Sequence, residues 1–233
     1  MEMLQGKAVT PTKLNLRFIL PLALIYLMIY LAADAVAFKL IAIKSFIEPG
    51  PPFIFPLSYI VGAIIAEVYG SDISKKIIWF TLICQLLYAF LVSKVISLPP
   101  PLDWPGQASY DFVFGDILHF VFSGTIAVLA SSFVNVYLIA KMKVLLDGKY
   151  YCLRNIISTA AGGFILIAII VVFVYLPALG VKEAFQMAYD IYALELFYTI
   201  IFVFPSWAIC GFLKKYEHLD VYDYNIKFNP FKF

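Results

Sequence analysis

Apolar residues fill most of this chain in long stretches, and short polar or proline-rich segments separate them. A helix needs about 20 mostly apolar residues to cross the hydrocarbon core of a bilayer. Lipid offers the backbone no hydrogen-bond partner, so only helices and closed barrels span it, and these stretches lack strict alternation. The pattern predicts an all-α, polytopic membrane protein with six transmembrane helices, over residues 18–43, 53–70, 75–98, 112–140, 155–179 and 191–213.

The composition supports this fold class and excludes others. Only 14% of the residues are charged and 63% are hydrophobic, whereas about 25% of residues are charged in an average soluble domain. The net charge is +2, and no Lys/Arg run suggests contact with nucleic acid. The three cysteines lie far apart without a Cys-x-x-Cys pair, which argues against a metal site or a disulfide framework. We expect neither a metal nor another cofactor.

The distribution of Lys and Arg predicts the orientation of the chain. Thirteen of these residues fall in the N-terminal segment, the second and fourth connections and the C-terminal segment, and four fall on the opposite side. Positive residues accumulate on the cytoplasmic side of a membrane. Both termini are therefore predicted to be cytoplasmic, with an N-terminal segment 1–17, a membrane domain 18–215 and a loosely ordered or interfacial tail 216–233. A plasma or inner membrane is the expected location.

Among the ionisable residues inside the predicted spans, four stand out: Asp34, Glu67, His119 and Glu195. Such residues are costly in lipid and face a partner or a water-filled path. Asp34 has two interpretations, a pair with Lys39 or a place in a transport path. His119 and Glu195 both fall in the outer third of their spans, so a pair between them could form a proton-responsive gate.

Spans 4 and 5 carry small polar residues. In span 4, His119, Ser123, Ser131 and Asn135 lie at about 0°, 40°, 120° and 160° around a helix. Ser158 and Thr159 lie with Gly162 and Gly163 on a small-residue face of span 5. Close helix packing explains the serines and glycines equally well, but an amide or imidazole in lipid requires a partner.

Span 2 reads FPLSYIVGAIIAEVYG, and its aromatic and acidic residues share one helical face. Phe55, Tyr59 and Ala63 are four residues apart, and Glu67 follows at the same spacing. The two rings could stack on a planar ligand above the carboxylate. The structural alternative for Glu67 is a salt bridge with Lys75 or Lys76, two turns further on.

The stretch FPLSYIVGAIIAEVYGSDISKKIIW is similar to the signature of the queuosine precursor transporter family, a group of six-helix, vitamin-uptake-type membrane proteins. Arg154-Asn155, Ser158-Thr159 and Pro205 follow in the matching order, and the resemblance covers roughly residues 53 to 215. It implies an architecture like that of the substrate-binding subunits of energy-coupling-factor transporters. It also implies import of 7-deazaguanine bases, which are precursors of a modified tRNA nucleoside.

The chain departs from the family at several polar positions. Ala63 stands where an aspartate is common, and Glu195 stands where a lysine is common. Ser132 and Asn135 correspond to a glutamine and an aspartate, and Gly163 and Leu166 to an amide and an aspartate. Either Glu67, Asn135 and Glu195 have taken over the contacts to the edge of the base, or the substrate has changed.

The function predicted from these observations is import of a small planar nucleobase-like substrate by a membrane transporter that is not an enzyme. The alternatives are a divergent paralogue with another small substrate, or a substrate-capture subunit that needs a separate energising complex. The expected partners are a 7-deazaguanine-like base and the lipid bilayer, with a homodimer as an option. The predicted substrate-binding residues are Phe55, Tyr59, Glu67, His119, Ser132, Asn135, Ser158, Thr159 and Glu195.

Overall fold

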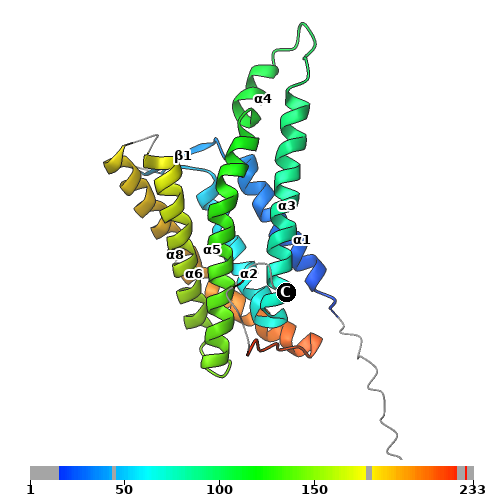
Figure 1. Ribbon diagram of the computed structural model, residues 1–233, viewed down its shortest axis with the longest axis vertical. Helices are drawn as coiled ribbons and strands as arrows, with labels where there is room; N and C mark the ends of the chain where they lie inside the picture. Colours follow the sequence, from blue (N-terminus) through cyan, green and yellow to red (C-terminus); the bar gives the residue numbers. More distant parts are fainter. Residues whose placement is uncertain (1–15, 44–45, 177–179, 225–228, 230–233) are drawn as a thin grey trace, which may run out of the picture.

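The computed structural model describes residues 16–43, 46–176, 180–224 and 229. The chain is mostly helical, with 79% of its residues in helices, and the long helices pack side by side into a bundle (Figure 1). Four helical stretches are long and apolar enough to cross a membrane: Ser71–Ile96, Gln107–Leu145, Tyr151–Phe173 and Val181–Glu217. Two shorter apolar helices, Ile19–Ala35 and Pro56–Tyr69, accompany them. The helical class predicted from the sequence is confirmed.

The first predicted span is wrong beyond residue 35. Helix α1 covers Ile19–Ala35, and strands β1 (Leu40–Ile43) and β2 (Phe46–Pro49) then form an antiparallel hairpin. The hairpin segment is rich in β-branched and aromatic residues, which favour a strand, and three prolines follow it closely. The hydropathy of 36–43 resembles that of a helix, but residues 36–39 form a turn and residues 40–43 pair with β2.

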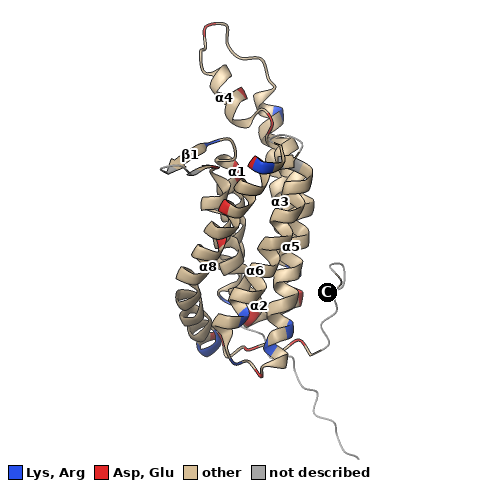
Figure 2. Cartoon of the chain, turned by 90° about the vertical axis from the view of Figure 1, so that its left-hand side faces the viewer, with Lys and Arg blue, Asp and Glu red and all other residues tan. Residues whose placement is uncertain are grey.

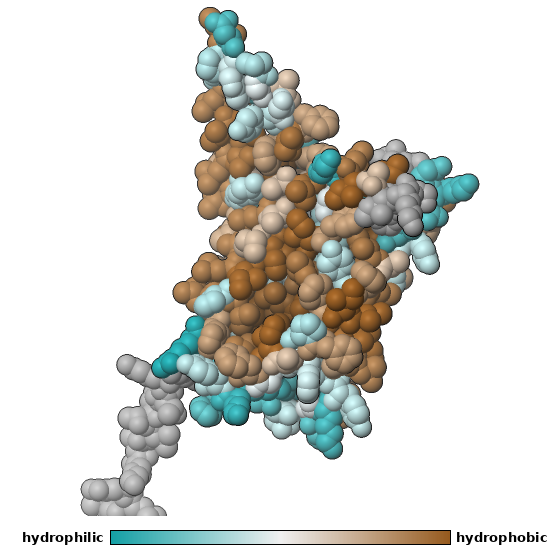
Figure 3. Space-filling view, turned by 180° about the vertical axis from the view of Figure 1, so that it is seen from behind, coloured by the Kyte–Doolittle hydropathy of each residue, from teal (hydrophilic) through white to brown (hydrophobic). Residues whose placement is uncertain are grey.

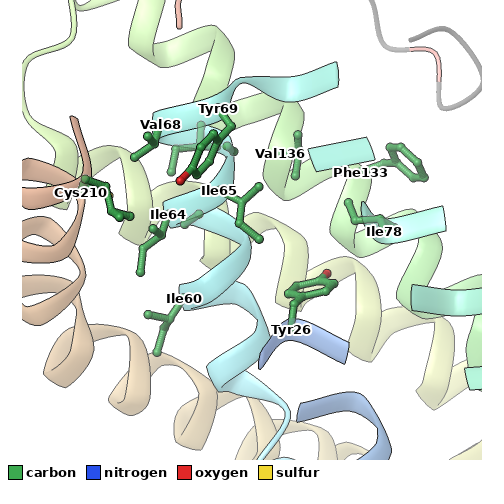
Figure 4. Packing of buried hydrophobic residues seen from close by; sticks show 14 of the residues in the cluster. Tyr26, Ile60, Ile64, Ile65, Val68, Tyr69, Ile78, Phe133, Val136 and Cys210 are labelled. Carbon is green, nitrogen blue, oxygen red and sulfur yellow. The ribbon is translucent and has the colours of Figure 1, made fainter. Parts of the chain in front are cut away.

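Helix α2 (Pro56–Tyr69) is the buried centre of the bundle. The prolines of the 3₁₀ turn η1 (Pro51–Phe53) and Pro56 at the first turn set its start, where a missing N–H costs nothing. Eleven of its 14 residues are buried. Its length is about 21 Å at 1.5 Å per residue, which is shorter than the hydrocarbon core. Neighbouring helices, rather than lipid, surround α2; Figure 4 shows its packing.

Helices α2 and α3 meet without the connection that the sequence suggested. Gly70 alone separates Tyr69 from α3 (Ser71–Ile96), and it adopts a φ of 87°. Glycine reaches this left-handed region without a Cβ clash. The polar segment GSDISKK is therefore the first turns of α3, and the predicted loop there is wrong.

Helices α5 (Ile117–Leu145) and α8 (Val181–Glu217) pack on α2, and α6 (Tyr151–Ile170) packs on both of them. Helix α4 (Gln107–Phe114) leads into α5, and α6 continues into the π turn η2 (Val171–Tyr175). Helix α8 begins ten residues earlier than predicted, directly after Gly180. The segment KEAFQMA, which lies between the predicted spans 155–179 and 191–213, contains good helix formers.

The outer surface of the bundle is apolar and its ends are polar. Large hydrophobic side chains lie exposed on α3, α6 and α8, among them Leu87, Phe164 and Phe204. Figure 3 shows this apolar band between hydrophilic ends. A surface of this kind is suited to lipid rather than to water. Residues 16–18 and the segment after α8 lie at one end, where Phe18 N–H donates to Glu217 Oε1 at 2.7 Å.

Candidate functional site

The end of the bundle that holds both chain ends contains a buried cluster of charges around Glu67. Both terminal nitrogens of Arg154 donate hydrogen bonds to the Glu67 carboxylate, at 2.7 and 3.1 Å. Lys214 Nζ donates to Glu67 Oε1 at 2.6 Å, and Lys143 Nζ lies 3.8 Å from the same oxygen. The Arg154 and Glu67 side chains are 0% and 1% exposed. Glu67 is therefore held by three cations.

The C-terminal tail completes this cluster. The Asp220 carboxylate accepts hydrogen bonds from Lys143 and, at 3.0 Å, from Lys214. Burial alone would raise the pKa of the Asp220 carboxyl, but hydrogen bonds from the two lysines outweigh burial and hold the pKa below its ordinary value. Most of the Lys and Arg residues in Figure 2 gather at this end of the bundle.

Two further contacts fix the tail against α2 and α3. Val221 N–H donates to the Val68 carbonyl at 3.4 Å, and Asp223 Oδ2 accepts from Ser71 N–H at 2.8 Å. The second contact caps the first turn of α3, where free N–H groups favour a carboxylate. The described part of the tail therefore packs on the bundle, so a loosely ordered tail is wrong for residues 218–224, whereas an interfacial position stays a prediction.

The predicted partners of Glu67 were also wrong. Lys75 lies 3.5 Å from Asp72, one turn away on its own helix. The cations that reach Glu67 instead come from α5, α6 and α8. Sequence distance could not identify them, because Arg154 is 87 residues away along the chain.

A second buried polar region lies about 12 Å along α2 from Glu67, at the level of Tyr59. Aromatic rings line one side of it. Tyr30 and Phe55 have ring centroids 5.2 Å apart, Phe55 and Tyr59 5.6 Å, and both pairs are edge-on. Tyr26 and Tyr30 share a hydrogen bond of 2.9 Å between their hydroxyls. We call this region the polar layer, and it comprises Tyr26, Tyr30, Phe55, Tyr59, Ser131, Ser132, Asn135, Asn155, Ser158, Thr159 and Glu195.

Helices α5 and α6 supply the hydroxyls and amides of the polar layer. Tyr59 OH donates to Ser131 Oγ at 3.0 Å, and the Tyr30 hydroxyl lies 3.4 Å from Ser132 Oγ. Asn135 Nδ2 donates to Thr159 Oγ1 at 3.3 Å. Gly162 allows this approach, because a Cβ there would lie 3.0 Å from the Ser131 carbonyl oxygen and 3.2 Å from Asn135 Cβ.

Glu195 contributes the charge of the polar layer. It is 3% exposed, and its Oε1 has no hydrogen-bond partner among the described residues. A Cβ on Gly163 would lie 2.0 Å from that oxygen, so the carboxylate occupies the space above a glycine. Tyr59 lies against the adjacent glycine, because a Cβ on Gly162 would lie 3.5 Å from the Tyr59 ring. An unpaired buried polar oxygen is costly and marks a position where a proton or ligand donor would be stabilising.

The structure brings together most of the residues predicted for the site, but not Glu67, which lies in the charge cluster about 12 Å away along α2, and not His119. Phe55, Tyr59, Ser132, Asn135, Ser158, Thr159 and Glu195 belong to the polar layer. His119 is exposed, and it lies about 18 Å along α5 from Ser131 at 1.5 Å per residue. Among the described residues it makes no ion pair with Glu195, which contradicts the proposed pair.

Asp34 has a partner other than the predicted one. Gln85 Nε2 on α3 donates to both carboxylate oxygens of Asp34, at 3.0 and 2.9 Å, whereas Lys39 is exposed. Asp34 is 4% exposed. The interpretation as a pair with Lys39 is therefore wrong, and the bond joins α1 to α3 instead.

Several members of these networks lie outside the predicted set of site residues. Asn155 donates to Tyr151 OH and Ser206 Oγ, each at 3.3 Å, and accepts from Thr159. A signal was present in the spacing, because Tyr151, Asn155 and Thr159 recur every four residues on one face of α6. Tyr26 and Tyr30 have the same spacing on α1.

Glu48 is a buried acid outside the spans and outside the predicted set of site residues. It lies in β2 and is 1% exposed, and its Oε2 has no hydrogen-bond partner among the described residues. Burial first, and then the nearby Asp190 carboxylate, raise the pKa of Glu48 to about 7. This acid therefore titrates near neutral pH at the end of the bundle opposite the tail.

The side chains of the polar layer are of the kinds that bind small polar molecules. In the described part of the chain, no three His, Cys, Asp or Glu side chains gather closely enough to hold a metal ion. The polar layer combines flat aromatic surfaces, an amide and a carboxylate, which suits reversible capture of a small polar molecule. The long apolar helices and the buried polar interior define an integral, multi-pass membrane protein.

The comparisons with known proteins agree with this class. Residues 49–209 match the family model described as "Putative vitamin uptake transporter". The match covers about two thirds of the chain, and the chain belongs to this family, as the resemblance to queuosine precursor transporters predicted. It is a family of transporters and not of enzymes, so the protein acts on a small molecule in a lipid membrane. Comparisons with curated proteins and with solved structures each gave no match.

Proposed function

We propose that this protein imports a small planar nucleobase-like molecule, a 7-deazaguanine precursor of queuosine, and binds it in the polar layer. The observation that carries the proposal is Glu195, a buried carboxylate with an unpaired oxygen beside aromatic rings. A guanine-like edge carries adjacent N–H donors, which suit a carboxylate or amide acceptor. Its faces suit aromatic contact.

Four residues are proposed to touch the ligand. Phe55 and Tyr59 supply aromatic surface, Asn135 supplies an amide, and Glu195 supplies a carboxylate. Ser132, Ser158 and Thr159 belong to the surrounding hydrogen-bond network in this proposal. Ser158 Oγ, for example, donates to the Asn155 carbonyl on its own helix at 3.1 Å.

Glu67 is proposed to be structural rather than substrate-binding. Its carboxylate already accepts from Arg154 and Lys214, and these are charge-assisted, largely buried hydrogen bonds. A ligand at Glu67 would have to displace a cation. His119 has no part in the proposed site, because it is exposed and lies far along α5.

The proposed orientation has six spans with both termini in the cytoplasm. It is supported by the excess of Lys and Arg near the chain ends and by their position at one end of the bundle. Under this orientation the Glu67 cluster faces the cytoplasm, and the β1–β2 hairpin and Glu48 face outward. Labelling of single cysteines placed at Ser97 and Asp147 by a membrane-impermeant thiol reagent would test it, with Ser97 accessible from outside.

The transport proposal is tested in cells that can neither make queuosine nor take up its precursors. We expect expression of this chain to restore modified tRNA when 7-deazaguanine precursors are supplied, and Glu195→Gln to abolish the effect at equal expression. Rescue only with an added energising complex would identify a substrate-capture subunit. Failure with every precursor, in protein that reaches the membrane, would show that this family member takes another small substrate.

The homodimer remains a prediction. The mass of the purified protein in a detergent micelle would test it.

A further inference from the structure

A chain of buried hydrogen bonds connects α8 to the polar layer, and its direction is fixed at one end. Ser206 Oγ donates to the Val203 carbonyl at 2.8 Å. A carbonyl oxygen only accepts hydrogen bonds. The single proton of Ser206 is therefore used, and its oxygen can only accept from other side chains.

The acceptor role of Ser206 Oγ fixes the donor and acceptor roles of Tyr151 and Asn155. Tyr151 OH donates to Ser206 Oγ at 3.2 Å, and Asn155 Nδ2 lies 3.3 Å from both hydroxyl oxygens. Asn155 therefore turns its amide nitrogen toward Ser206 and Tyr151. Its carbonyl oxygen points the other way, along α6 toward Thr159.

The direction then reaches Asn135. Thr159 Oγ1 donates to Asn155 Oδ1 at 3.2 Å, so its oxygen is left to accept from Asn135 Nδ2 at 3.3 Å. Every side chain from Ser206 to Asn135 is at most 6% exposed, so water does not interrupt the sequence of donors. The Asn135 amide is thereby oriented, with its nitrogen bound and its carbonyl left as an acceptor.

A second, shorter series of hydrogen bonds orients the Tyr59 hydroxyl. Ser131 Oγ donates to the Val128 carbonyl at 3.0 Å, so it can only accept from Tyr59 OH, which lies 3.0 Å away. The Tyr59 proton is used in this bond. The Tyr59 oxygen is left to accept a further hydrogen bond.

We infer that these two chains make the polar layer a site of hydrogen-bond acceptors that selects ligands with adjacent N–H donors. Asn155 and Ser131 are the positioning residues. They direct the Asn135 carbonyl and the Tyr59 oxygen to act as acceptors alongside the Glu195 carboxylate. This inference rests on the proposed function, because it assumes that the ligand lies in the polar layer.

The selectivity follows from the edges of the bases. The edge of 7-deazaguanine carries an N–H and an adjacent NH₂, whereas 7-deazaadenine has an unprotonated ring nitrogen beside its NH₂. An acceptor placed against that ring nitrogen gains no bond and loses its water. 7-Deazahypoxanthine keeps the N–H and lacks the neighbouring NH₂, so it should bind with intermediate affinity.

The test measures dissociation constants of the purified full-length protein in lipid nanodiscs for these three bases. We expect Asn155→Ala and Thr159→Val to lower the preference for 7-deazaguanine over 7-deazaadenine by about tenfold, because Asn135 is then free to rotate and present its nitrogen. Thr159→Ser keeps the hydroxyl and should keep the preference. Thr125→Val is the matched control, since Thr125 donates only to the Val121 carbonyl of its own helix.

Three outcomes decide between the inference and the proposed function. Thermal unfolding first establishes that the wild type, Asn155→Ala and Thr159→Val are all folded. If the three proteins then prefer 7-deazaguanine over 7-deazaadenine equally, the inference is overturned and the proposed function stands. Binding of isocytosine in preference to cytosine, without binding of any 7-deaza base, would support the acceptor site and overturn the proposed substrate. Absence of binding by every base, donor-rich ones included, would overturn both.

Discussion

The two buried polar regions of this protein differ in how completely their charges are paired. At the tail end, Glu67 and Asp220 face Lys143, Arg154 and Lys214, and each carboxylate accepts from at least two cations. In the polar layer, Glu195 has an oxygen without a partner among the described residues. A fully paired cluster holds helices together, whereas an unpaired carboxylate raises the free energy of the empty state and is relieved by a ligand. The same residue type therefore has a structural role at one level of the bundle and a proposed binding role at the other.

The largest expected effect is on the paired cluster. Arg154→Met removes the bidentate partner of Glu67 and leaves a buried carboxylate with weaker compensation, so we expect the free energy of unfolding to fall by about 3–5 kcal/mol. Unfolding of the purified protein in mixed micelles measures it. The double variant Glu67→Gln, Arg154→Met should recover part of the loss. No loss in the single variant would show that the lysines alone hold Glu67.

A smaller effect is expected where Gly163 meets Glu195. Gly163→Ala puts a Cβ in the space of the carboxylate, so we expect it to lower the free energy of unfolding by about 1–3 kcal/mol. In the Glu195→Ala background, the same change should cost much less, because the oxygens are gone. A double-mutant cycle measures this coupling, and additive effects would contradict the contact.

Glu195 itself is expected to behave in the opposite way to Arg154. Glu195→Gln replaces an unpaired carboxylate by a neutral amide, and we expect the free energy of unfolding to stay constant or rise by about 0–2 kcal/mol. The same micelle titration measures it, beside the loss of uptake. A destabilisation as large as that of Arg154→Met would mean that Glu195 has a structural partner in the membrane.

The smallest effect concerns the tail. Asp220 is 40% exposed, so Asp220→Asn should cost about 0.5–1 kcal/mol and speed proteolytic cleavage after residue 217. Since the pKa of Asp220 is lowered on folding, its contribution is complete above its unfolded pKa of about 4. The contribution is lost as the pH falls through the lower folded pKa.

Pepsin digestion at pH 3 and pH 2 follows that loss. Asp103→Asn, in the α3–α4 connection, is the matched control and should leave the tail as resistant as in the wild type. With a protease that is active at neutral pH in place of pepsin, an unchanged rate in Asp220→Asn would show that Val221 and Asp223 alone retain the tail.

Hydropathy located the helices well and their boundaries less well. Stretches of Leu, Ile and Phe long enough to cross lipid can be identified without knowing how the helices pack. Each predicted span contains a helix. The β1–β2 hairpin was missed because apolar character does not distinguish a strand from a helix over eight residues. The early start of α8 was missed as well. The predicted connection over residues 71–74 is helical instead, and Gly70 alone, with its positive φ, makes the turn.

The candidate site shows a similar division. The i, i+4 spacing of Phe55 and Tyr59 and the polar stripe of α5 placed most of the residues on the right faces. Pairings between helices could not be read from spacing, so Glu67 was assigned to nearby lysines and Glu195 to His119. The nearest cation along the chain is rarely the nearest in a bundle, where neighbouring helices are dozens of residues apart.

The sequence by itself determined that this is a helical membrane protein of a vitamin-uptake-type family, because length and hydropathy decide which segments leave water. It also identified Glu195 as a costly residue in need of an explanation. Only the tertiary structure decided which carboxylate is satisfied. Arg154, Lys143 and Lys214 converge on Glu67 from three helices, whereas the space above Gly163 brings Glu195 beside the rings and leaves an oxygen unpaired. Pairing depends on distances across helices, and those distances exist only once the chain has folded.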